Sequence, residues 1–128
     1  MSGGWGAGEA TPVVAKPSDY APHVLVLTRF RAPVGDDAFR ARLEEALAVL
    51  AEQRGFLDGH LGRNVDDPGL WVLQTRWDGP GAYRRALSAY DVKMRAWSVL
   101  GEAIDEPTAY EVVEPGTALN EARPRHNG

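Results

Sequence analysis

The stretch LWVLQTRWDGPGAY, residues 70–83, decides the fold. Its first eight residues are mostly apolar, β-branched or aromatic, without glycine or proline, which predicts a strand over residues 70–77. Side chains alternate along a strand, so one face carries Trp71, Leu73, Thr75 and Trp77, and the other carries Leu70, Val72, Gln74 and Arg76. A turn signal at residues 78–81 leads into a helix that begins near Pro80. The turn therefore brings Tyr83 back over the strand end that Trp77 occupies.

Composition limits the classes of protein to consider. A chain of 128 residues predicts one domain, and its net charge of −4 argues against a nucleic-acid partner. The chain has no cysteine, which excludes disulfides and thiolate chemistry, and its three histidines match no metal-ligand spacing. No apolar run approaches the roughly 20 residues that span a bilayer, and the N-terminus lacks the pattern of a secretory signal. We expect a cytoplasmic protein without membrane contact.

The remaining elements follow from periodicity and turn signals. Residues 23–31 form a strand that is apolar on both faces in its first half. Asp36 or Asp37 caps an amphipathic helix that starts at residue 38 and ends before Gly55. A strand over residues 56–65 is weakened or bulged by its two glycines. A second helix runs to about residue 103 with a break near residues 88–91, and a strand follows at 107–113.

This order, β-α-β-β-α-β, predicts an α+β ferredoxin-like sandwich over residues 22–114. Residues 1–21 are expected to form a flexible arm, in which Trp5 is an anchor on a neighbour or simply exposed, and residues 115–128 form a tail. Two helices cover only one face of a four-stranded sheet, yet the first strand is apolar on both. We therefore expect a homodimer in which two sheets pack face to face.

Residues 54–87 resemble the antibiotic biosynthesis monooxygenase (ABM) domain. The matching features are a Gly-Phe pair at the second strand, an arginine near its end, an acidic-acidic-Pro-Gly hairpin, a strand ending in Trp and an Ala-Tyr pair in the next helix. In this sequence they are Gly55-Phe56, Arg63, residues 66–69, Trp77 and Ala82-Tyr83. The resemblance extends over about residues 23–114 and implies a dimeric α/β barrel. The family hosts several functions, so the fold implies no single activity.

Members of this family include cofactor-independent monooxygenases that oxidise aromatic polyketides with O2. The resemblance implies chemistry without metal or flavin, in which a deprotonated substrate passes an electron to O2 inside a dry aromatic pocket. Such enzymes use a Trp at the end of the third strand and a Tyr six positions on, which correspond here to Trp77 and Tyr83. The Asn that they place four residues before the Trp is Leu73, a departure from the pattern.

A second branch of the family degrades haem. It uses an Asn near the end of the first strand, which falls on Thr28, and a Trp and a His on the second helix. The Trp position falls at about Ala86, and no histidine occurs between His60 and His126. The sequence therefore disfavours haem degradation.

The candidate catalytic residues are Trp77, Tyr83, His60 and Arg29. His60 is the natural general base near neutral pH, and the positive charge of Arg29 would stabilise a substrate enolate or phenolate. The candidate substrate-binding residues are Thr28, Leu73, Thr75, Tyr90, Met94 and Trp97, of which the last three are expected to face the sheet. Several of these residues also have an ordinary structural explanation: core packing for the aromatic residues and Met94, a surface or interface position for His60, and an ion pair with a carboxylate for Arg29.

Three functions fit these residues. The first is a cofactor-independent monooxygenase that acts on an aromatic or polyketide-like small molecule. The second is a non-catalytic dimeric binding or accessory protein, which the replaced Asn and the lack of an evident base favour. The third is a polyketide cyclase or isomerase on the same fold, which would not consume O2.

Overall fold

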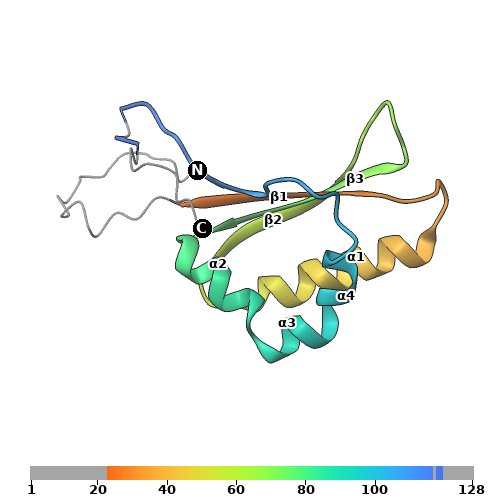
Figure 1. Cartoon of the computed structure of the whole chain (residues 1–128), viewed down its shortest axis with the longest axis horizontal. Helices are drawn as coiled ribbons and strands as arrows, with labels where there is room; N and C mark the ends of the chain where they lie inside the picture. Colours follow the sequence, from red (N-terminus) through yellow and green to blue (C-terminus); the bar gives the residue numbers. More distant parts are fainter. Residues whose placement is uncertain (1–22, 117, 120–128) are drawn as a thin grey trace, which may run out of the picture.

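The computed structural model describes residues 23–116 and 118–119 as a single sheet with helices on one side (Figure 1). The expected arm with Trp5 lies outside the described residues, as does most of the expected tail. The elements in chain order are β1 (Val24–Arg31), α1 (Asp37–Ala51), β2 (Phe56–Arg63), β3 (Leu70–Trp77), α2 (Pro80–Leu87), α3 (Tyr90–Arg95), α4 (Trp97–Leu100) and β4 (Ala109–Glu111). This is the predicted α+β order, and the ferredoxin-like fold is confirmed.

The four strands lie in the order β2-β3-β1-β4, and all of the pairs are antiparallel. The central pair aligns Val24 with Trp77 and Thr28 with Leu73. Alternate side chains of β1 are buried beneath the helices, as are Leu73, Thr75 and Trp77 of β3. The predicted division of β3 into two faces is therefore correct.

A β-bulge in β2 changes which of its side chains face the helices. The register shifts between Phe56, which pairs with Trp77, and Asp58, which pairs with Arg76. Without this extra residue, Phe56 and His60 would lie on one face, because side chains alternate with period two. With it, Phe56 stays on the helix side and His60 pairs with Gln74 on the opposite side.

The helix after the β3 turn differs from the prediction. The expected break falls where α2 ends and α3 begins, at residues 88–89, but a second break at Ala96 separates α3 from α4. The expectation that Tyr90, Met94 and Trp97 face the sheet is wrong, because these side chains are 73%, 65% and 50% exposed. A parallel stripe with the same spacing is buried instead, formed by Val92, Ala96 and Val99. Its small side chains let α3 and α4 approach α1 closely.

The sheet face away from the helices is open within the described part of the chain (Figure 1). It carries half-buried aliphatic side chains from the two central strands, namely Leu25, Leu27, Leu70 and Val72. Tyr110 of β4, which pairs with Leu25, adds an aromatic ring that is 49% exposed. The fourth strand is shorter than predicted and covers only three residues.

Candidate functional site

Trp77 is the centre of an aromatic cluster between the sheet and α2. Its side chain has no exposed surface, and its ring lies 5.4 Å from Phe56 and 5.7 Å from Tyr83 between centroids. The Phe56 ring meets it edge-on at 86°, and the Tyr83 ring is tilted at 51°. Such pairs stabilise a fixed ring geometry beyond the effect of burial alone. The predicted pairing of Trp77 with Tyr83 is therefore present in the structure.

The backbone around Gly55 explains why Tyr83 lies so close to Trp77. The Asp78 amide donates to the Gly55 carbonyl at 2.8 Å, which joins the end of β3 to the start of β2. Gly55 has φ +91°, and a Cβ at this position would collide with the Cβ of Ala82. The first turn of α2 thus packs directly on the Gly55 backbone. This close approach fixes the next residue, Tyr83, above the indole.

The phenol of Tyr83 is held in its neutral form. Burial raises the pKa of Tyr83 above the usual value, and a hydrogen bond with the Thr108 side chain offsets this only in part. Thr108 is tied to the sheet because the Leu27 amide donates to its carbonyl at 2.8 Å. At neutral pH the Tyr83 hydroxyl is consequently a hydrogen-bond donor rather than a base. Neither Phe56 nor Thr108 was predicted for the site. Phe56 lies beside Trp77 because the two residues pair across β2 and β3, and Thr108 is held there by its backbone bond to Leu27 of β1.

Two threonines are the buried polar residues among those that the structure describes, with Thr28 9% and Thr75 2% exposed. The Trp77 indole nitrogen donates to the Thr75 hydroxyl at 2.8 Å, so Thr75 satisfies a donor that would otherwise be buried without a partner. Thr28 lies diagonally across the strand pair, because Thr28 pairs with Leu73 and Thr75 pairs with Val26. Leu73, which is 2% exposed, is part of the same buried surface.

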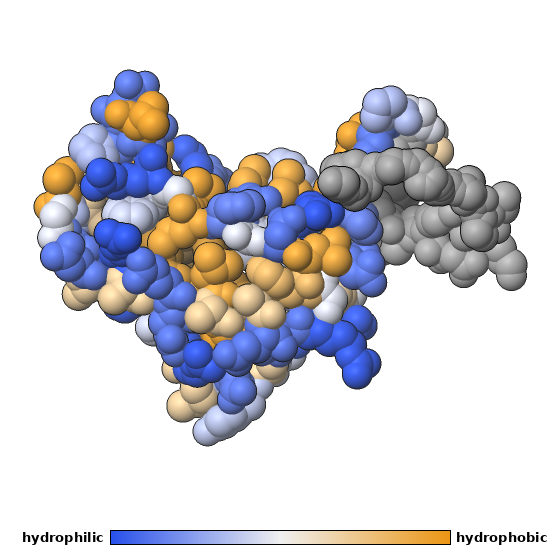
Figure 2. Space-filling model, turned by 180° about the vertical axis from the view of Figure 1, so that it is seen from behind, coloured by the Kyte–Doolittle hydropathy of each residue, from blue (hydrophilic) through white to orange (hydrophobic). Residues whose placement is uncertain are grey.

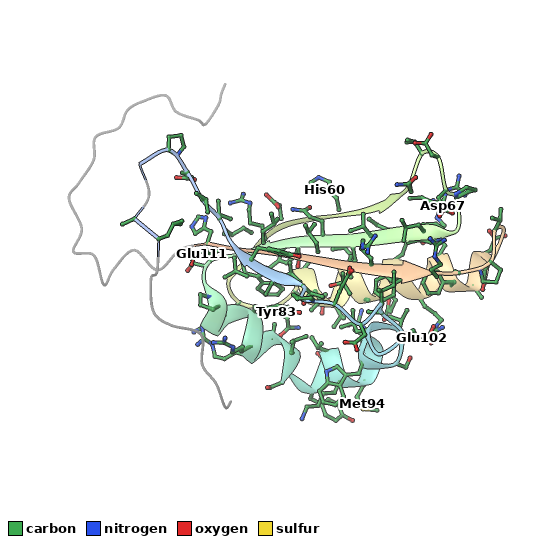
Figure 3. All side chains as sticks on the ribbon, turned by 45° about the horizontal axis from the view of Figure 1, so that its top comes forward. His60, Asp67, Tyr83, Met94, Glu102 and Glu111 are labelled. Atoms are coloured by element: carbon green, nitrogen blue, oxygen red, sulfur yellow. The ribbon has the colours of Figure 1, made fainter. Side chains whose placement is uncertain are left out.

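His60 and Arg29 lie on the opposite face of the sheet from Trp77 and Tyr83. Figure 3 shows His60 above the sheet and Tyr83 between the sheet and the helices. The His60 ring contacts the Gln74 side chain at 2.9 Å and is solvent-exposed. Arg29 forms two hydrogen bonds of 2.7 Å with the Glu106 carboxylate. The structure therefore separates the predicted catalytic residues into two groups, on either side of the sheet.

The Arg29–Glu106 ion pair has two parallel contacts, a geometry that fits guanidinium to carboxylate. The hydrogen bond to Arg29 lowers the pKa of Glu106, and the reciprocal bond raises the pKa of Arg29. Further pairs on this side join Arg76 to Asp58 at 2.7 Å and Arg31 to Asp67 at 2.9 Å. Charges on the open face are thus neutralised within the chain.

Tyr90, Met94 and Trp97 lie on the outer surface of the helix layer, and Figure 3 shows Met94 at the side farthest from the sheet. The Trp97 indole donates to the Leu87 carbonyl at 2.9 Å, and the Lys93 ammonium lies 5.3 Å from the centre of its ring. These three residues cannot contact a ligand bound beside Trp77. Of the predicted substrate-binding residues, Thr28, Leu73 and Thr75 are the ones that lie on the helix side of the sheet with Trp77.

A separate groove of about 450 Å³ lies between α1 and β2, and the sequence did not predict it. Leu47, Leu61 and Trp71 line it, and the Arg63 guanidinium lies 5.8 Å from the centre of the Trp71 ring. Seen from behind, hydrophobic residues gather in the middle of the molecular surface and hydrophilic residues surround them (Figure 2). The groove contains neither Trp77 nor Tyr83, so it is distinct from the aromatic cluster.

Residues 23–116 and 118–119 contain no group of three or more His, Cys, Asp or Glu side chains arranged to hold a metal ion. No helix in these residues has the length and apolar character needed to cross a membrane.

Comparison with known proteins identifies the fold and the family. The family model described as antibiotic biosynthesis monooxygenase matches residues 23–93. SnoaB, a cofactor-independent oxygenase from Streptomyces nogalater, has a similar crystal structure: the TM-score is 0.64 and the identity 23%, over 73% of this chain and 96% of SnoaB. A variant of SnoaB with one asparagine replaced by alanine gives the same values. Rv0793 from Mycobacterium tuberculosis has a TM-score of 0.59 and 20% identity, over 74% and 99% of the two chains. No protein with a curated description matches this sequence.

Proposed function

The chain belongs to the antibiotic biosynthesis monooxygenase family, and we propose that it oxidises an aromatic small molecule with O2 and without a cofactor. The observation that carries this proposal is the cluster of Trp77 with Phe56 and Tyr83 on the helix side of the sheet. Pockets that bind flat ligands are lined mainly by hydrophobic and aromatic side chains. SnoaB, which shares the fold, is itself a cofactor-independent oxygenase.

In the proposed reaction the substrate itself reacts with O2, and the protein supplies a hydrogen-bond donor and a site without water. An electron-rich hydroxyarene loses a proton, passes an electron to O2, and is oxidised to a quinone as one oxygen atom enters the ring and the other leaves as water. The neutral Tyr83 hydroxyl would donate to the developing anion, and the buried rings around Trp77 would exclude water. Thr28, Leu73 and Thr75 would contact the same ligand.

One observation favours a second function, a protein that binds an aromatic molecule without changing it. Among the described residues the aromatic cluster has no evident general base, since His60 lies on the other face and the pKa of Tyr83 is raised. In the oxygenase, the proton would then have to leave the substrate spontaneously or through water. An acidic substrate such as an anthrone meets this requirement better than a simple phenol.

We further propose that two copies pair through their open sheet faces. The half-buried Leu27 and Val72 and the exposed ring of Tyr110 provide apolar surface there. The bidentate Arg29–Glu106 pair and the Arg76–Asp58 pair are already formed within each chain, which reduces the cost of covering these charges. In this arrangement His60 and Arg29 belong to the interface, and each copy keeps its own ligand site beneath the sheet.

Oxygen uptake with anthrone and naphthol substrates, measured in the presence of a metal chelator, tests the proposal. The oxygenase predicts O2 consumption in step with quinone formation, and Trp77→Phe should lower the rate at least tenfold. Trp97→Phe is the matched control, because Trp97 lies on the outer helix surface. A bound ligand recovered unchanged would favour the binding protein. An isomeric product formed without O2 uptake would favour a cyclase.

A further inference from the structure

A short strap, residues 104–108, joins α4 to β4 and runs along the side of β1. The Ile104 amide donates to the Arg29 carbonyl at 2.8 Å. The Arg29 side chain in turn donates two hydrogen bonds of 2.7 Å to the Glu106 carboxylate, one to each oxygen. The strap is thus fastened to a single residue of β1 by a backbone bond and a bidentate ion pair.

Thr108 ends the strap and connects it to the aromatic cluster. The Leu27 amide donates to its carbonyl at 2.8 Å, and its side chain forms a hydrogen bond with the Tyr83 phenol. Burial raises the pKa of Tyr83, and the bond with Thr108 opposes this effect. A hydrogen bond lowers the pKa of a phenol when it stabilises the phenolate. The Thr108 hydroxyl is therefore the donor, and the phenol oxygen is the acceptor.

The direction of this bond decides which hydrogen remains for a ligand. Because the phenol oxygen accepts from Thr108, the hydrogen of the Tyr83 hydroxyl stays free to be donated elsewhere. The Tyr83 ring is fixed by its contact with Trp77, at 5.7 Å between centroids, but the O–H bond can still rotate. The bond from Thr108 favours rotations in which this hydrogen points away from the strap. Linked hydrogen bonds also polarise one another, so the phenol becomes a stronger donor.

We infer that Thr108 is a positioning residue that directs the Tyr83 hydroxyl toward an anionic oxygen of the ligand, and that the Arg29–Glu106 pair holds Thr108 in place. The inference rests on the proposed function, in which Tyr83 donates to the developing anion. It gives Arg29 an indirect role, although its side chain lies on the open face of the sheet. The strap lies beyond residues 23–93, so the family match assigns no role to it.

Binding of 4-nitrophenol to the full chain tests this inference. This phenol ionises near neutral pH, and only its phenolate absorbs visible light, so a titration of the bound dye compares the affinities of the two forms. Thr108→Val should lower the affinity ratio of phenolate to neutral phenol by about threefold to tenfold, because Tyr83 becomes a weaker and less directed donor. Thr108→Ser, which keeps the hydroxyl, should retain the ratio of the wild type.

A double-mutant cycle shows whether the effect passes through the phenol. In the Tyr83→Phe background, Thr108→Val should cause no further loss, because the hydroxyl that it directs is gone. In the O2-uptake assay, Thr108→Val should lower kcat and leave KM unchanged, because the anion develops only in the transition state.

Glu106→Gln tests the other half of the inference and should lower the phenolate ratio in the same direction as Thr108→Val. Asp67→Asn is the matched control. Asp67 pairs at 2.9 Å with Arg31, which lies on the same face of β1 as Arg29, but it does not contact the strap. Its loss should leave the ratio unchanged.

The outcomes separate this inference from the proposed function. An unchanged ratio in Thr108→Val, or an equal loss in the Tyr83→Phe background, overturns the role of Thr108 and leaves the oxygenase proposal standing. An unchanged ratio in Glu106→Gln, or an equal loss in Asp67→Asn, overturns the role of the ion pair. Absence of dye binding, together with no O2 uptake on any substrate, would overturn both the inference and the proposed function.

Discussion

The indole nitrogen of Trp77 donates to the hydroxyl of Thr75, two residues earlier in the same strand, at 2.8 Å. Both side chains point to the helix side of β3, and both are buried. A strand places residues i and i+2 on one face, so the bond is built into the local backbone. It fixes the plane of the ring against which Phe56 and Tyr83 pack.

Thr75→Val should destabilise the protein by about 1–3 kcal/mol, because the indole N–H would stay buried without an acceptor. Denaturation by urea, followed by tryptophan fluorescence, measures the free energy of unfolding. Thr75→Ser, which keeps the oxygen, should recover most of the loss. Equal stability of Thr75→Val and the wild type would show that this hydrogen bond does not organise the site.

Gly55→Ala should destabilise the fold more than the matched change Gly35→Ala. Both glycines have positive φ, +91° and +86°, so alanine costs about 1–2 kcal/mol at either position. Only at Gly55 would the new Cβ also collide with Ala82, whereas nothing lies within 4 Å at Gly35. The total loss at Gly55 should reach about 3 kcal/mol or more.

Thermal unfolding of the two glycine variants makes this comparison, and Ala82→Gly in the Gly55→Ala background should restore part of the lost stability. Similar melting temperatures for Gly55→Ala and Gly35→Ala would contradict the close contact between α2 and the start of β2.

Glu106→Gln should lower stability at neutral pH but not in acid. The hydrogen bond from Arg29 lowers the pKa of Glu106 in the folded state. A lowered pKa stabilises the fold above the unfolded value, about 4.3 for Glu, and this contribution disappears as pH falls through the folded pKa. Melting temperatures of the wild type and the variant should differ from pH 7 to about pH 5 and converge only at lower pH, as pH falls through the lowered folded pKa of Glu106. A difference that persists in acid would contradict the ion pair.

Val72→Glu should convert the proposed dimer into a monomer. Val72 is half-buried on the open sheet face, where a second copy would desolvate the added carboxylate. Met94→Glu places the same charge on the outer helix surface and should leave the dimer intact. Light scattering after gel filtration at micromolar concentration compares the two. A monomeric wild type would contradict the pairing of open faces.

The sequence was sufficient for features that depend on local pattern. Alternation along residues 70–77 predicted the face shared by Thr75 and Trp77, and the turn that follows predicted the position of Tyr83. The order of elements gave the fold. These predictions succeed because each depends on the geometry of one strand or on one chain reversal.

Features that depend on packing between distant segments were not predictable. The bulge at Leu57 moves His60 to the open face, and strand pairing alone reveals it. On α3 and α4, the stripes that begin at Tyr90 and Val92 have equal spacing, and the close approach of α1 selects the smaller one for burial. Arg29 follows Thr28 directly in β1, and consecutive side chains of a strand point to opposite faces. The two residues could therefore not contact the same ligand, and this much was predictable from the sequence.

The central claim, that an aromatic ligand binds beside Trp77 beneath the sheet, is tested most directly by the indole N–H signals in a ¹H–¹⁵N NMR spectrum. The chain has four tryptophans, so single Trp→Phe variants assign each signal. Titration with 1-naphthol under nitrogen should shift the Trp77 signal saturably and leave that of Trp97, on the outer helix surface, unchanged. A saturable shift at Trp97 or Trp71 with Trp77 unmoved would contradict the account.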